Sequence, residues 1–214
     1  MADNPGATSA ELAGLRGVAL LDALDRTEAV DASALDVNAV ADAIDPRELG
    51  QSDLKRLLAA LVRLSDEVPA FSLAKVDPTK FATLVARASR TQLELVLAER
   101  PLRERVLDEI FARMGAHIRA RSLHAVVHWR LSGGTGDGGY DRYETVLSDG
   151  TCTVSREMRE KPRVTITLSP VDFFRVITHQ ATPAVLFVTG KLKVKGDLAF
   201  AAGLVGHFDL PRPA

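Results

Sequence analysis

The sequence predicts an α+β domain that is preceded by an all-helical domain. Through the first half of the 214 residues, apolar residues recur at the three- and four-residue spacing of amphipathic helices. From His124 onwards apolar and polar residues alternate, which is typical of strands with one buried face. Helical patterns return after residue 168, around one further strand. We therefore expect an acidic helical domain over residues 1–98 and an α+β domain over residues 99–214.

Helix start signals occur early in the chain. Thr8 and Glu11 fit a capping box, in which side chains bind backbone N–H groups of the first turn. Asp45 and Pro46 are a second start signal, with Asp as N-cap and Pro at the first helical position. Because Gly50 follows closely, we expect this second signal to open only a short turn.

Longer helices are expected between residues 52 and 118. Ser52 is expected to cap a helix, and Asp77 with Pro78 to open the next. A short helix around Leu93 and a longer one from Pro101 follow. Five leucines share one face of the first of these helices: Leu54, Leu57, Leu58, Leu61 and Leu64.

A weak internal repeat relates two of these segments. The apolar spacing that begins at Asp36 resembles the spacing that begins at Asp77, with a shift of two residues between the two halves of the match. A solenoid needs at least about three repeats. The pattern predicts two similar helical hairpins, and chance similarity is the alternative.

The charges are distributed unevenly. Residues 1–98 carry 10 Lys and Arg against 15 Asp and Glu, whereas residues 99–214 carry 17 against 13. Two units of opposite charge attract each other, although chance variation on solvated faces gives the same counts. The net charge of −1 argues against a general nucleic-acid binder, so we expect no nucleic-acid partner.

The composition indicates a cytoplasmic protein. The lone cysteine, Cys152, cannot form an internal disulfide, which favours a reducing compartment. No uncharged apolar run reaches the ~18 residues that a membrane span needs. Residues 1–14 have neither the basic start nor the apolar core of a signal peptide.

Five strands are expected in the second half. The first begins at His124, and the glycine-rich residues 133–139 separate it from a second strand over residues 140–148. Asp149 and Gly150 are a strong signal for a two-residue hairpin turn, after which Cys152 lies on the return strand. We expect Ala125, Val127, Trp129 and Leu131 to share one face of the first strand.

The remaining strands alternate with short helices. A fourth strand covers residues 164–168, and Ser169 caps a helix directly after it. Thr182 with Pro183 opens another short helix that ends at Gly190. A fifth strand covers residues 191–195, and Asp197 caps the last helix.

Two of these helices, over residues 183–189 and 198–206, contain no charged residue. A helix that is apolar all round is normally covered all round. A sheet layer covers only one side, so something else is needed on the other. The N-terminal helices, a second subunit or an apolar ligand would each serve.

We expect no enzyme, metal site or cofactor. His124 and His128 are four residues apart, but on a strand this spacing separates them by about 13 Å. The loop over residues 134–139 is glycine-rich, but a strand follows it and not the helix that a phosphate loop requires. Strand alternation points Cys152 towards the core as an inert thiol.

Lys191, Lys193 and Lys195 give the fifth strand one basic face. The face is either simply solvated or a contact for an anionic partner. That partner would be the headgroups of a membrane, in a transient contact, or the acidic N-terminal half. The residues leave these alternatives open.

Two segments of the second half resemble the sterol carrier protein family. They are VTITLSPVDFF at residues 164–174 and TGKLKVKGDL at residues 189–198. The resemblance covers about residues 102–208, and the N-terminal helical domain lies outside it. It implies a five-stranded sheet with helices on one face, which together enclose an apolar tunnel for a sterol, a fatty acid or an acyl chain. The family usually has a glycine where this chain has His179.

The resemblance also implies which residues line or close the tunnel. They are Phe173, Phe174, Ile177, Leu186, Val188, Leu192, Val194, Leu198, Ala201, Leu204 and Val205. The expected function is lipid binding or lipid transfer. The alternative is an interaction or scaffold protein whose tunnel is filled by its own helices or by a second subunit.

Overall fold

The computed structural model describes residues 14–27, 35–68, 71, 75–116 and 123–214. Contacts divide the chain into two compact units, Leu107–Pro211 and Met1–Val106 with Arg212–Ala214. The division falls within one long helix, α8 (Arg100–Ala116). The boundary predicted after residue 98 lies just before this helix.

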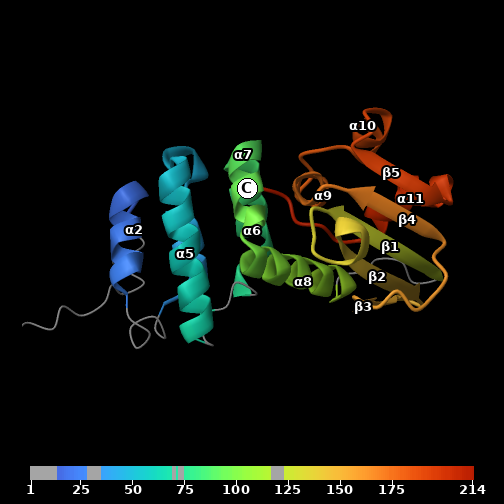
Figure 1. Cartoon of the computed structure of the whole chain (residues 1–214), viewed down its shortest axis with the longest axis horizontal. Helices are drawn as coiled ribbons and strands as arrows, with labels where there is room; N and C mark the ends of the chain where they lie inside the picture. Colours follow the sequence, from blue (N-terminus) through green and yellow to red (C-terminus); the bar gives the residue numbers. More distant parts are fainter. Residues whose placement is uncertain (1–13, 28–34, 69–70, 72–74, 117–122) are drawn as a thin grey trace, which may run out of the picture. The chain divides into compact units, whose positions relative to one another are not determined.

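The N-terminal unit is built from helices (Figure 1). Its elements are α2 (Gly17–Arg26), α4 (Val37–Ala43), the 3-10 turn η1 (Pro46–Glu48), α5 (Gln51–Glu67), α6 (Pro78–Arg87), α7 (Arg90–Ala98) and the start of α8. Its core is almost entirely aliphatic, and Leu24 and Leu64 are fully buried in it. Arg56 on α5 binds Asp22 and Asp25 on α2, which fixes the two helices side by side.

The start signals of these helices are largely as predicted. Asp77 accepts hydrogen bonds from the first turn of α6, and Asp45 caps the short turn η1. The expectation that Ser52 caps α5 is wrong, because the extended residue Gly50 is the N-cap and Ser52 lies inside the first turn. The capping box predicted at Thr8 and Glu11 lies outside the described residues.

The two segments of the predicted repeat begin alike. Asp36 caps α4 through Asn38 N–H, as Asp77 caps α6 through Thr79 N–H. Asn38 also joins the two caps, since its side-chain oxygen accepts from Asp77 N–H at 2.7 Å. The helices that follow differ in length, with 17 residues in α5 and 9 in α7.

The second unit contains a five-stranded mixed sheet in the order β3-β2-β1-β4-β5 (Figure 1). Its strands are β1 (Ala125–Ser132), β2 (Tyr140–Ser148), β3 (Thr151–Ser155), β4 (Val164–Leu168) and β5 (Leu192–Gly196). β1 and β4 are parallel, and the other neighbours are antiparallel. Asp149 and Gly150 both have positive φ, which is the backbone of the predicted hairpin turn between β2 and β3.

Short helices follow β4 and β5. They are α9 (Pro170–Ile177), α10 (Pro183–Val188), α11 (Leu198–Gly203) and the 3-10 turn η4 (Leu204–His207). Ser169 and Asp197 cap α9 and α11 as predicted. This unit is therefore the expected α+β fold with a five-stranded sheet.

Gly196 makes the turn from β5 into α11 possible. Its φ is +109°, and a Cβ atom there would lie 2.4 Å from the carbonyl oxygen of Arg163. The same carbonyl accepts a hydrogen bond from Asp197 N–H, so it cannot easily move away. Glycine is needed at this position both for its backbone conformation and for the close approach.

Candidate functional site

The core face of the sheet holds an aromatic cluster. Phe111 of α8 stacks on Tyr143 of β2 with ring centroids 4.0 Å apart. It also stacks on Phe173 of α9 at 5.2 Å and meets Trp129 of β1 edge-on at 5.8 Å. This part of the sheet is thus filled by the protein's own side chains, and one predicted lining residue, Phe173, belongs to the filling.

Three hydrogen-bonded side chains, Tyr143, Asp108 and Arg156, lie at one side of the aromatic cluster. Tyr143 Oη donates to Asp108 Oδ1 at 2.7 Å, and Arg156 donates to both of these atoms. Burial raises the pKa of Tyr143, and the hydrogen bond to Asp108 raises it further. The phenol therefore stays protonated and holds α8 against the sheet.

The predicted lining residues lie mainly away from this cluster, on β5 and the helices around it. Leu204 is fully buried, and Leu186 is the buried residue of α10. On β5, Leu192 and Val194 share the core face with Trp129, because their partners on β4 are Leu168 and Ile166. Seven of the eleven are buried: Phe173, Phe174, Ile177, Leu186, Leu192, Ala201 and Leu204.

The other four have contact with solvent. Val194 and Val205 are half-buried. Val188 is 85% exposed and Leu198 is 51% exposed. The predicted set therefore divides into seven buried, two half-buried and two exposed residues, and the exposed ones lie on α10 before β5 and on α11 after it. The helix α10, which was expected to be covered all round, is buried only at Leu186.

His179 shows why a glycine is usual at its position in the family that the sequence resembles. Its φ is +59°, in the left-handed region that glycine enters without steric cost. His179 N–H donates to Val176 O at 3.1 Å, just past the end of α9. The residue therefore forms the helix end and retains the glycine-like backbone, with an imidazole added.

The opposite face of the sheet holds a buried pair that was not predicted from the sequence. His128 Nε2 lies 3.0 Å from Glu144 Oε2, and Glu160 N–H donates to the same oxygen at 2.9 Å. His124, by contrast, is exposed beside Asp149. Within the described ranges, no group of three His, Cys, Asp or Glu could hold a metal ion.

Cys152 is half-buried on β3. Burial raises the pKa of its thiol to about 11. Less than a thousandth of the thiol is then ionised at pH 7, by the usual titration relation. This direction favours the inert thiol predicted from the sequence, although Cys152 is less deeply buried than expected.

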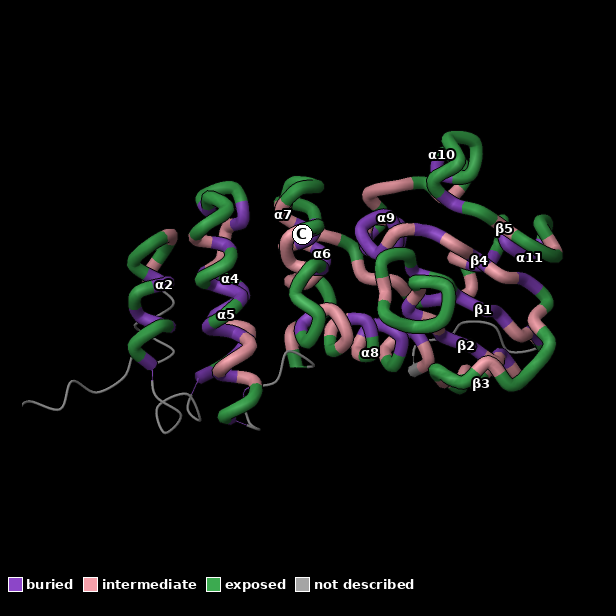
Figure 2. The backbone as a smooth tube through the Cα atoms, in the orientation of Figure 1, coloured by how far each residue is buried: buried purple, intermediate pink, exposed green. Residues whose placement is uncertain are grey.

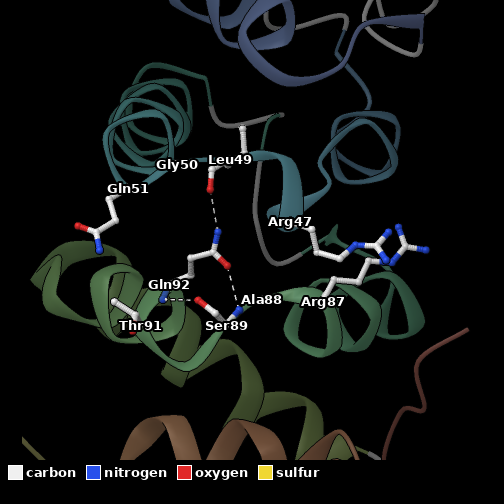
Figure 3. A pocket seen from close by; sticks show the side chains of 9 residues that line it. All are labelled: Arg47, Leu49, Gly50, Gln51, Arg87, Ala88, Ser89, Thr91 and Gln92. Carbon is white, nitrogen blue, oxygen red and sulfur yellow. Dashed lines mark hydrogen bonds between the residues drawn. The ribbon is translucent and has the colours of Figure 1, made fainter.

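The N-terminal unit has a pocket of about 440 Å³ (Figure 3). The side chain of Gln92 crosses it, donating to the carbonyls of Pro46 and Leu49 and accepting from Ser89 N–H. These contacts hold the turn before α5 to the start of α7. The pocket is lined by Arg47, Leu49, Gly50, Gln51, Arg87, Ala88, Ser89, Thr91 and Gln92, and so shares no residue with the predicted lipid site.

Comparison with known protein families identifies the second unit. The model of the SCP-2 sterol transfer family matches residues 107–209, close to the range over which the sequence resembles sterol carriers. This part of the chain is an SCP-2 domain. The preceding residues, which include the N-terminal helices, lie outside the match. No curated protein matches the chain.

Several solved structures are similar to the chain. Sterol carrier protein 2 of Yarrowia lipolytica, in its apo form, is 27% identical over 38% of this chain and 64% of its own, with a TM-score of 0.31. The chain thus spans less than two thirds of that protein. Palmitated SCP2L2 of Aedes aegypti is 21% identical over 47% and 88%, with a TM-score of 0.36. The sec-alkylsulfatase Pisa1 of a Pseudomonas species is 18% identical over 90% and 27%, with a TM-score of 0.42.

In the part of the chain that the structure describes, no helix has both the length and the apolar character to cross a bilayer.

Proposed function

We propose that the SCP-2 domain binds a lipid with an apolar chain between β5 and the helices α9, α10 and α11. The observation that carries this proposal is the family match together with the eleven predicted lining residues on these elements and on the turn η4, all of which are apolar. The aromatic cluster fills the core face at β1 and β2, so a ligand is proposed to bind near the edge strand β5. The proposed role is binding or transfer of lipid without catalysis.

The apolar set can supply enough free energy without a polar anchor. Burial of a sixteen-carbon chain contributes about 12 kcal/mol at ~0.8 kcal/mol per CH₂ group. Lost translational freedom and chain ordering cost several kcal/mol of this. Micromolar binding follows. Palmitate, which one of the similar structures carries, is the first ligand to test.

A second candidate is a scaffold whose interior is filled by the protein itself or by a second subunit. The stacking of Phe111 on Tyr143 and Phe173 favours it, because these rings already occupy part of the core face. Under this alternative the side chain of Leu186 packs against protein. Under the lipid-binding proposal it packs against ligand.

The variant Leu186→Trp separates the two functions. Overpacking a filled core costs about 1–3 kcal/mol, whereas filling a ligand cavity is neutral or stabilising. We expect the variant to lose displacement of a fluorescent fatty acid by palmitate while its thermal midpoint is unchanged or raised. Val185→Trp is the matched control, because Val185 is 59% exposed on the same helix. A fall of many degrees in the midpoint of Leu186→Trp would favour the scaffold.

A further inference from the structure

Exposed apolar side chains are concentrated around β5. Five large hydrophobic side chains are exposed among the described residues, and four of them flank this strand. Val185, Phe187 and Val188 lie on α10, before β5, and Leu198 begins α11, after it. Figure 2 shows α10 as almost wholly exposed. An exposed apolar cluster of this kind typically marks a surface for another molecule.

Three backbone carbonyls near the end of α10 are paired within the protein. The carbonyls of Val185, Leu186 and Phe187 accept hydrogen bonds from the N–H groups of Thr189, Lys191 and Gly190, respectively. The hydroxyl of Thr189 also donates to the carbonyl of Val185. These three carbonyls would therefore enter an apolar phase already paired, which lowers the cost of insertion into lipid, whereas the N-terminus of α10 has no side-chain cap.

Three lysines accompany the apolar side chains. Lys191, Lys193 and Lys195 are exposed, and none has an ion-pair partner among the described residues. Residues 173–196 contain no Asp or Glu, so this stretch of the domain carries only positive charge. A surface that combines apolar side chains with lysines is complementary to an anionic bilayer, which has acyl chains beneath negative headgroups.

Two other roles, protection of a sheet edge and docking of a second copy, explain the exposed apolar side chains and the lysines less completely than an anionic bilayer does. β5 is an edge strand, and lysines on an edge prevent two sheets from pairing. That role gives no reason for the exposure of Phe187 and Val188. A second copy docked through the same surface about a two-fold axis would bring lysines against lysines, which like-charge repulsion opposes.

We propose that α10 and the lysines of β5 form a docking surface for an anionic lipid bilayer. The side chains of Val185, Phe187 and Val188 enter the interface, and the lysines contact the headgroups. Only the purpose of the docking rests on the proposed lipid-binding function: Leu186, the buried residue proposed to meet the ligand, lies on the helix that would meet the membrane.

The test measures partition of the full chain onto vesicles of phosphatidylcholine, with and without 30% phosphatidylserine. We expect binding that needs phosphatidylserine and weakens in 0.5 M salt. Each lysine at such a surface contributes a factor of about five, so the triple variant Lys191→Gln, Lys193→Gln, Lys195→Gln should bind at least tenfold more weakly. The double variant Lys55→Gln, Lys161→Gln, which removes two exposed lysines elsewhere, should bind like the wild type.

A second set of variants tests the apolar side chains. Changing Val185, Phe187 and Val188 to Ser should weaken partition at least tenfold, whereas Val18→Ser should not, although Val18 is 53% exposed. An environment-sensitive fluorophore on Val188→Cys, in a Cys152→Ala background, should shift to the blue with anionic vesicles. The same label on Val18→Cys should not shift.

The outcomes separate this proposal from the proposed function. Unchanged partition in both triple variants, or no blue shift at Val188, would overturn the docking surface. A wild-type chain that self-associates through these residues and ignores vesicles would overturn it in favour of a second copy. Vesicle binding as predicted, without displacement of the fluorescent fatty acid by palmitate, would instead leave the docking surface standing and refute the lipid-binding function.

Discussion

Gly196 offers a sharp test of the turn that places α11 beside the proposed ligand site. Substitution by Ala puts a Cβ atom 2.4 Å from the Arg163 carbonyl oxygen, at a φ of +109°. A non-glycine residue in such a region costs about 1–3 kcal/mol, and displacing the carbonyl also weakens its hydrogen bond with Asp197 N–H. We expect Gly196→Ala to destabilise the domain by about 3 kcal/mol.

A loss of this size is readily measured. For a domain of about 100 residues, 1 kcal/mol shifts the thermal midpoint by about 4–8 °C, so calorimetry should show a fall of at least about 12 °C. Gly203→Ala is the matched control, because Gly203 lies in α11 and a Cβ atom there would meet nothing within 4 Å. Because Gly203 is the last residue of this helix, where helix propensity counts for little, the variant should keep a thermal midpoint within about 3 °C of the wild type. A Gly196→Ala midpoint within 3 °C of wild type would refute the reasoning.

Three further outcomes follow from single sites. Tyr143→Phe should lose about 1–2 kcal/mol in urea unfolding, because it removes the hydrogen bonds to two charged groups while these still bind each other. The thiol of Cys152 should react with iodoacetamide at pH 7.5 at least tenfold more slowly in the folded chain than in 6 M urea, because burial raises its pKa to about 11. The side-chain hydrogen bond from Arg47 lowers the pKa of Asp45 to about 2, so its contribution to stability is complete above about pH 4 and is lost as the pH falls through 2. Asp45→Asn, which keeps a capping oxygen, should therefore cost about 1 kcal/mol at pH 7, after allowance for solvent screening, and less than half of that at pH 2, where about half of the folded-state carboxylates are still ionised; equal costs at both pH values would contradict the assignment.

Local signals in the sequence predicted most of the second unit. Ser169 and Asp197 are N-caps, and Asp149 with Gly150 forms the hairpin turn, because each of these depends on backbone geometry over four residues or fewer. The capping box of Ser89 and Gln92, which the sequence analysis did not predict, follows the same local rule. At Ser52 the rule failed, because glycine at position 50 already supplies the extended N-cap backbone.

Contacts between residues that are far apart in the sequence could not be predicted from such local signals. His128 meets Glu144 only because β1 and β2 pair in one register across the glycine-rich loop, and a shift of one residue would send these side chains to opposite faces. The exposure of Val188 also could not be predicted from the sequence. An all-apolar helix indicates that cover is needed, but not whether the chain itself supplies it.

Native mass spectrometry of the full chain with palmitate tests the central claim most directly. We predict that the folded protein, mixed with palmitate at about 20 μM, carries one fatty acid per chain. Leu186→Trp, with an unchanged charge-state distribution, should carry none. Wild-type protein that stays folded and ligand-free under these conditions would contradict the account, and would identify the apolar set around β5 as core that the protein fills itself.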